Sequence, residues 1–146
     1  MFKASLLAAA VVVVAAVAPA QAGEVEVKML TRGEAGMMVF EPAVVHVQPG
    51  DTVRFVPVDP GHNAESLKGM IPEGAGPFKG GIGKELAVTF TVEGVYGYNC
   101  MPHYGMGMVG LVVVGDAAAN AEAVKAVQQR GRAAERFAAL FAGLQG

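Results

Sequence analysis

The chain has 146 residues and a formal net charge of −2, from 11 lysines and arginines against 13 aspartates and glutamates. This length suits one domain with its own hydrophobic core, and the weak negative charge gives no support for nucleic-acid binding. A single cysteine excludes an internal disulfide, so Cys100 is buried and inert, free, or bound to a metal.

The first 22 residues have the features of a secretory signal peptide. Lys3 supplies a positive start, residues 6–18 are apolar but too short to span a bilayer, and Ala20-Gln21-Ala22 offers small residues for cleavage. An uncleaved membrane anchor is the less favoured alternative, because a polar, strand-like segment follows at once. Cleavage after Ala22 leaves residues 23–146 as one domain of 124 residues (146 minus 22), and the loss of Lys3 changes the formal charge from −2 to −3.

Alternating polar and apolar residues, the signature of a half-buried strand, recur in short segments separated by glycine and proline. The alternating segments are residues 24–30, 44–47, 52–56 and 86–92. Residues 37–40 form a short apolar segment, residues 95–98 lead up to Cys100, and residues 108–114 are wholly apolar. Residues 58–84 show little periodicity, although residues 65–70 fit one helical turn, and a loop of this length is usually functional. Several short strands with such turns predict a β-sandwich.

The C-terminal part of the chain has a helical character. Residues 116–127 are rich in helix formers, with Asp116 or Asn120 as candidate N-caps, and Gly131 interrupts the pattern. One apolar stripe of an amphipathic helix then follows, made by Phe137, Leu140, Phe141 and Leu144. We therefore expect two C-terminal helices that pack on the outside of the strands.

Residues 99–108 hold the only cysteine, one of three histidines and three methionines. Cys100, His103 and Met108 have the spacing Cys-x2-His-x4-Met, and a thiolate, an imidazole and a thioether form a soft ligand set that suits copper. A second histidine must come from elsewhere, and His62 is the best candidate. We therefore expect one copper ion, cycling between Cu(I) and Cu(II), in a type 1 (blue) site made by these four residues.

The sequence also suggests roles for residues near the expected copper ligands. His46 lies inside an alternating segment and is interpreted as a surface histidine rather than a ligand. Asn63, next to His62, is a candidate to pin the loop that carries Cys100. His103 is expected to present its imidazole edge to solvent within an apolar ring of Met38, Pro102, Tyr104, Gly105 and Met106, although Met38 and Met106 also suit plain packing.

Several stretches together resemble the pseudoazurins, bacterial blue copper proteins of the cupredoxin family. They are residues 38–43, 49–53, 61–63, 69–75 and 102–110, and the similarity extends over 24–144. The plastocyanins share the Cys-x2-His-x4-Met spacing but lack the helical tail. The resemblance implies an eight-stranded Greek-key β-sandwich with two C-terminal α-helices, and copper ligation by His62, Cys100, His103 and Met108.

The resemblance also implies a function. It suggests a monomeric, periplasmic one-electron carrier, not an enzyme, that serves a reductase such as copper nitrite reductase in denitrification, or a c-type cytochrome. Three positions differ from the pattern common in the family: Met101 replaces a threonine after the cysteine, and Pro60 and Asn99 replace lysines. The remaining candidates for a basic docking patch are Lys68, Lys79, Lys84 and Arg32.

Three other functions fit the sequence less well. A copper enzyme of this fold needs further His-rich copper centres, and His46 is the only histidine left over. A copper(I) chaperone, or a carrier without redox shuttling, is the main alternative, but the eight methionines are mostly scattered. A zinc site from one cysteine and two histidines would more often have a cysteine, histidine or carboxylate as its fourth ligand than methionine.

Overall fold

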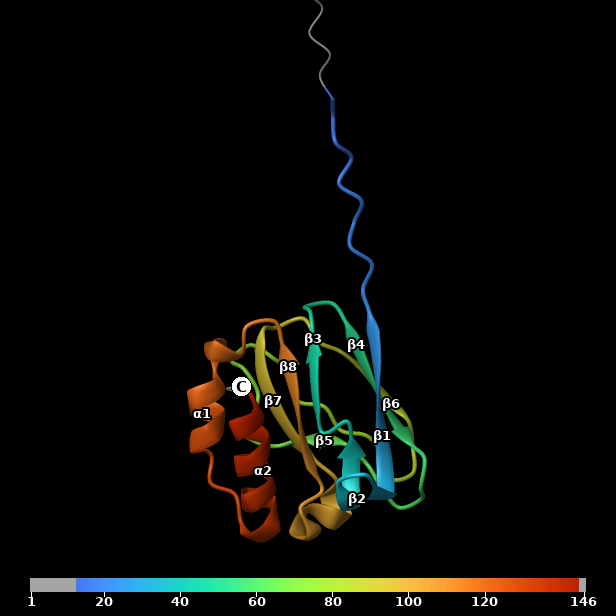
Figure 1. Cartoon of the computed structure of the whole chain (residues 1–146), viewed down its shortest axis with the longest axis vertical. Helices are drawn as coiled ribbons and strands as arrows, with labels where there is room; N and C mark the ends of the chain where they lie inside the picture. The colour runs from blue at the N-terminus through green and yellow to red at the C-terminus, as the bar shows by residue number, and fades with distance from the viewer. Residues whose placement is uncertain (1–12, 145–146) are drawn as a thin grey trace, which may run out of the picture.

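The computed structural model describes residues 13–144. Lys3 and the first part of the apolar run, on which the signal-peptide prediction depends, lie outside the described residues. Residues 13–23 have no regular secondary structure and extend away from the folded part of the chain (Figure 1). Across residues 13–144 we find no helix with the length and apolar character that crossing a bilayer would require.

Two four-stranded sheets pack face to face. The first sheet has the order β2 (Gly36–Glu41), β1 (Glu24–Gly33), β4 (Thr52–Pro57) and β6 (Leu86–Thr89). The second has the order β3 (Val44–Val47), β8 (Val109–Val114), β7 (Gly94–Asn99) and β5 (Glu65–Ser66). Strands β1 and β4 are parallel, as are β3 and β8, so the connections between them cross the ends of the sandwich. The predicted eight-stranded Greek-key sandwich is confirmed.

The hydrophobic core has two parts that share the second sheet. One cluster lies between the two sheets and includes Phe55, Cys100 and Val112. The other includes Leu111 of β8 and Phe137 of the last helix, so it lies between the second sheet and the C-terminal helices. Because β8 is covered on both faces, its residues are all buried, which explains why its sequence is apolar without alternation.

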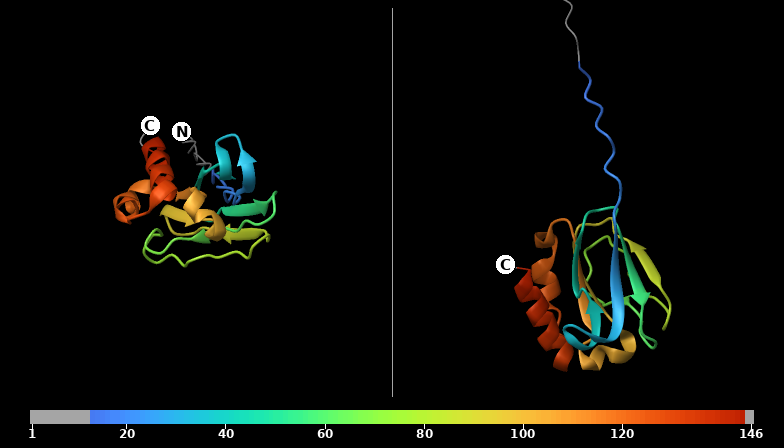
Figure 2. Two further views of the ribbon diagram at one scale, coloured as in Figure 1. Left: turned by 90° about the horizontal axis from the view of Figure 1, so that it is seen from below. Right: turned by 45° about the vertical axis from the view of Figure 1, so that its right-hand side comes forward.

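The helical tail lies along one side of the sandwich (Figure 2). It consists of a short 3-10 turn η2 (Ala117–Ala119), α1 (Ala121–Ala126) and α2 (Gly131–Gly143). Phe137 and Phe141 of the predicted stripe are buried, so the expected packing of this face is confirmed. Gly131 does not interrupt a helix but begins one, with a positive φ of 54° at the junction between α1 and α2.

The two candidate N-caps have different roles. Asp116 caps η2, since its Oδ1 accepts a hydrogen bond of 2.9 Å from the backbone N–H of Ala118. Asn120 stands at the N-cap position of α1 but makes no capping hydrogen bond. Its amide instead accepts from the N–H of Val95 at 2.6 Å and donates to the carbonyl of Val95 at 2.9 Å, which fixes the helical tail to β7.

Two expectations about local structure were wrong. The helix expected at residues 65–70 does not form. The stretch begins with the short strand β5 (Glu65–Ser66), in which Glu65 pairs with Asn99 of β7, and continues into a turn at residues 68 and 69. The strand expected over residues 86–92 ends at Thr89. A two-residue edge strand is stabilised by pairing with a distant segment, and a local pattern carries no signal for such a contact.

Candidate metal centre

The cysteine loop closes on itself between β7 and β8. Cys100 directly follows β7, and η1 (Met101–Met106) forms the 3-10 turn of the loop. The backbone N–H of Cys100 donates to the carbonyl of Met108 at 2.9 Å, and the N–H of Met108 donates to the carbonyl of His103 at 3.2 Å. These hydrogen bonds hold Cys100, His103 and Met108 close together. The loop between β7 and β8 that carries them lies at the lower end of the sandwich in Figure 1.

The loop also requires glycine at one position. Gly107 has a φ of 84°, which side chains disfavour, and a Cβ there would lie 3.2 Å from the backbone oxygen of Arg132 in α2. The tight return of the chain to Met108 therefore depends on this residue.

His62 joins the loop from the connection between β4 and β5. Its Nδ1 lies 3.1 Å from Nδ1 of His103 and 3.8 Å from Sγ of Cys100, and the latter two atoms are 3.4 Å apart. The point equidistant from the three atoms is then about 2.0 Å from each, close to the length of a metal–nitrogen bond. Three soft donors with this spacing fit a copper ion.

A contact at Nε2, on the other side of the His62 ring, explains why Nδ1 is available to bind a metal. The hydroxyl of Thr31 lies 3.0 Å from Nε2 of His62 and can accept the Nε2–H bond, which leaves Nδ1 unprotonated. Thr31 is held in turn, because its backbone N–H donates to Asp59 at 2.8 Å. Burial, followed by the nearby His103, lowers the pKa of His62, while Asp59 acts in the opposite direction. His62 is therefore neutral near pH 7, as a metal ligand must be.

Cys100 is fully buried in the core between the sheets. Burial raises the pKa of the Cys100 thiol, backbone N–H groups of Asn63 and His103 lower it, and the charge of Glu65 raises it. The net shift is upward, so the thiol carries its proton near neutral pH until a cation compensates the buried thiolate. Metal binding supplies this compensation.

Asn63 connects the two segments that form the site. Its Oδ1 accepts a hydrogen bond of 2.7 Å from the backbone N–H of Met101, and its Nδ2 donates to the carbonyl of Gly80 at 3.1 Å. The expectation that Asn63 pins the cysteine loop is confirmed. Both bonds are made by a buried side chain, so the link between His62 and Cys100 is shielded from water.

The remaining predicted residues also have clear positions. Met108 is fully buried in the same cluster as Cys100. His46 is exposed on β3 and takes no part in the site, as expected. Within residues 13–144, the group of histidine, cysteine and acidic side chains able to hold a metal comprises His62, Cys100 and His103.

Two supporting residues were missed from the sequence. Thr31 lies just beyond the strand expected over residues 24–30, yet β1 extends to Gly33 and places Thr31 next to His62. Gln129, between α1 and α2, accepts a hydrogen bond of 2.6 Å from the hydroxyl of Tyr104 and its Nε2 lies 3.0 Å from Sδ of Met70. Both contacts join segments far apart in the chain, and no local pattern indicates them.

Known proteins are similar to this chain in sequence and in fold. Residues 27–115 match the family model for copper binding proteins of the plastocyanin/azurin family. Over 146 residues the chain is 51% identical to pseudoazurin from Methylorubrum extorquens, and the alignment covers 99% of each chain. The chain belongs to the pseudoazurin family. It is also 49% identical to pseudoazurin from Paracoccus pantotrophus over 142 residues, covering 97% of this chain and 98% of that one.

A solved structure agrees with the sequence relatives. The crystal structure of pseudoazurin from Methylobacterium extorquens superimposes with a TM-score of 0.81 at 54% identity, covering 84% of this chain and 99% of that one. Pseudoazurins are electron-transfer cupredoxins that use copper and are not enzymes. The predictions of a cupredoxin fold, a copper cofactor and a non-enzymatic electron carrier are therefore confirmed.

Proposed function

We propose that His62, Cys100, His103 and Met108 bind one copper ion as a type 1 site. The observation that carries this proposal is the convergence of three soft donor atoms on a point about 2.0 Å from each. Met108 would be the fourth ligand, because its buried thioether follows the loop directly, lies in the same core cluster as Cys100 and would supply a further weak sulfur donor.

The chain's own residues keep the ligands in place. Copper, when bound, supplies a centre that gains and loses one electron. Thr31 fixes the ring of His62, and Asn63 ties the cysteine loop to the His62 segment. Ligands held by such outer contacts rearrange little between the two charge states, so the scaffold favours fast electron transfer.

Electrons are proposed to leave through His103, whose side chain is partly exposed while His62 is fully buried. The described part of the domain, residues 23–144, exposes five large hydrophobic side chains at this end of the sandwich. They are Met37, Val58, Ile82, Met101 and Met106, which we call the apolar face. An apolar surface around a ligand lets a redox partner approach closely in a small, transient contact, typically below about 1,200 Å².

The protein is proposed to act in the periplasm after cleavage at Ala22. The crystallised relative covers 84% of this chain whereas the full relative covers 99%, which is the difference expected if a leader is removed. Cleavage would convert the backbone nitrogen of Gly23, now 2.6 Å from Oδ1 of Asp51, into an ammonium group paired with that carboxylate. Mass spectrometry of protein recovered from the periplasm tests this boundary, and a mature chain starting elsewhere contradicts it.

The proposed partner is a redox protein, with a copper nitrite reductase or a c-type cytochrome as the favoured examples. The carrier is proposed to be a monomer. Voltammetry of the copper-loaded protein, with electron delivery to a copper nitrite reductase assayed alongside, tests this function. We expect a reversible one-electron couple and reduction of the enzyme. A protein that holds only Cu(I), without such a couple, would instead be the copper(I) chaperone.

A further inference from the structure

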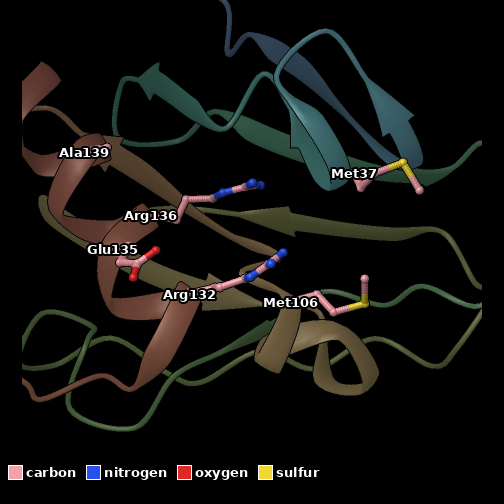
Figure 3. Close-up of a pocket in the computed structure, with 6 residues that line it drawn as sticks. All are labelled: Met37, Met106, Arg132, Glu135, Arg136 and Ala139. Atoms are coloured by element: carbon pink, nitrogen blue, oxygen red, sulfur yellow. The ribbon is translucent and has the colours of Figure 1, made fainter.

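A surface pocket lies beside the apolar face and contains none of the proposed copper ligands. It has a volume of about 590 Å³ and is open between α2 and the methionines of β2 and η1 (Figure 3). Its lining residues are Met37, Met106, Arg132, Glu135, Arg136 and Ala139. Met37 and Met106 belong to both the pocket and the apolar face, so the two surfaces are continuous.

The pocket is distinguished by two cations on one side of α2. Arg132 and Arg136 are four residues apart on the helix, and Figure 3 shows both side chains extending towards Met37 and Met106. A guanidinium nitrogen of Arg136 lies 3.4 Å from the carbonyl oxygen of Met38, which orients that group at the pocket wall. Within residues 13–144, neither arginine has a carboxylate oxygen within ion-pair distance.

Glu135 does not neutralise this pair. Its carboxylate lines the pocket but remains beside the helix in Figure 3, away from the methionines that both arginines approach. With two arginines and one glutamate, the lining has a formal charge of +1. By contrast Lys79, one of the cations expected from the sequence to dock a partner, is paired with Glu65 at 3.7 Å.

We propose that this pocket receives a carboxylate side chain from the surface of the redox partner docked over His103. The inference rests on the proposed function and names the chemistry of the partner's contact surface. Guanidinium groups bind carboxylates through two parallel hydrogen bonds, so Arg132 and Arg136 would fix the orientation of the partner as well as attract it. The apolar face then lets the partner approach His103 closely, and the charge of the pocket steers the partner into the correct orientation.

Charge reversal at Arg132 tests the pocket without disturbing the fold. The side chain of Arg132 is exposed, and Gly107 packs against its backbone and Cβ rather than its guanidinium group. Lys28→Glu is the matched control, because Lys28 is exposed in the middle of β1, a strand that contributes no residue to the pocket. Both variants change the net charge equally. The probes are an acidic and a basic c-type cytochrome, each mixed with copper-loaded protein in stopped flow.

We expect Arg132→Glu to slow electron exchange with the acidic cytochrome about tenfold at low ionic strength, and to lose this effect in high salt. Exchange with the basic cytochrome should be unchanged or faster, and the visible spectrum and potential should be unchanged. Lys28→Glu should change either rate by a clearly smaller factor, because Lys28 does not line the pocket that receives the carboxylate. Arg136→Gln should likewise slow electron exchange with the acidic cytochrome and leave exchange with the basic cytochrome unchanged.

Three results would overturn the inference. Equal rates for Arg132→Glu and Lys28→Glu would show that only net charge matters. Equal slowing with both cytochromes would show a general defect rather than carboxylate binding. A wild-type dimer that Arg132→Glu dissociates would make the occupant a second copy of this chain. If the wild-type protein exchanges electrons with neither cytochrome, the proposed function itself fails, and the inference fails with it.

Discussion

The two ends of the sandwich differ in how many of their polar groups are paired and in how much apolar surface they expose. At the end where the chain enters, Asp51 accepts hydrogen bonds from the backbone N–H groups of Gln48 and Gly23, and Asn120 binds both polar groups of Val95. At the copper end, methionines are exposed and two arginines have no acidic partner within the described chain. Substitutions at the end where the chain enters should therefore change stability without changing copper binding, whereas substitutions at the copper end can change both.

The largest effects are expected from removing the two histidines. His62→Gly and His103→Gly should each weaken copper binding by more than the roughly 100-fold that loss of an outer contact costs. Added imidazole should restore the visible band of His103→Gly, because solvent reaches that position, but not that of His62→Gly, whose site is fully buried. Absorption titrations with imidazole measure this difference. Equal recovery of both variants would mean that the two ligands are equally accessible.

Asn63→Ala should affect both stability and copper. It removes the acceptor for the N–H of Met101 and the donor for the carbonyl of Gly80, and both groups are left without their partner. We expect a loss of about 2–4 kcal/mol in the free energy of unfolding and copper binding weakened about 10–100-fold. Urea unfolding of the copper-free protein and competition with a chelator measure the two effects. Unchanged copper affinity would show that Asn63 does not position the ligands.

The same substitution at the opposite end provides a matched control. Asn120→Ala removes two hydrogen bonds to Val95 and should lower the free energy of unfolding by about 2–3 kcal/mol. Copper affinity and the visible spectrum should remain as in the wild type, because Asn120 lies at the end away from the metal. A change in the copper spectrum of this variant would contradict the separation between the two ends.

The smallest effect concerns Asp51 and depends on pH. Hydrogen bonds from the backbone N–H groups of Gln48 and then Gly23 lower the pKa of Asp51. A lowered pKa stabilises the fold above the ordinary carboxyl pKa of about 4, and this stabilisation disappears as pH falls through the lowered value. Asp51→Asn should therefore be less stable than wild type near pH 7, and the difference should shrink in acid. Urea unfolding of the copper-free proteins at several pH values checks this, and a pH-independent difference would exclude a role for the charge.

Much of the fold and the centre of the site were predictable because their signals are local. Short alternating or apolar segments predicted most strands, and the apolar stripe predicted the buried face of α2, including Phe137 and Phe141. Three of the four expected ligands lie within one loop, so their spacing alone indicated a soft metal site. His62 is distant in the chain, and its choice rested on elimination among only three histidines.

What the sequence did not predict depends on contacts between distant segments. The strand β5 exists because Glu65 pairs with Asn99, and the role of Thr31 arises only when β1 passes behind His62. The arginines of α2 were not among the expected docking cations, because helical periodicity shows which face is apolar but not which loops the polar side approaches. Such contacts become visible only when the sheets and helices are assembled.

The central claim is that a buried thiolate and two imidazoles bind copper at one point. Titration of the copper-free protein with Cu(II), followed by visible absorption, tests it most directly when compared with a Cys100→Ser variant. The account predicts an intense blue or green band that saturates at one equivalent in the wild type and is missing from the variant. A colourless wild type, together with equal copper uptake by the variant, would contradict it.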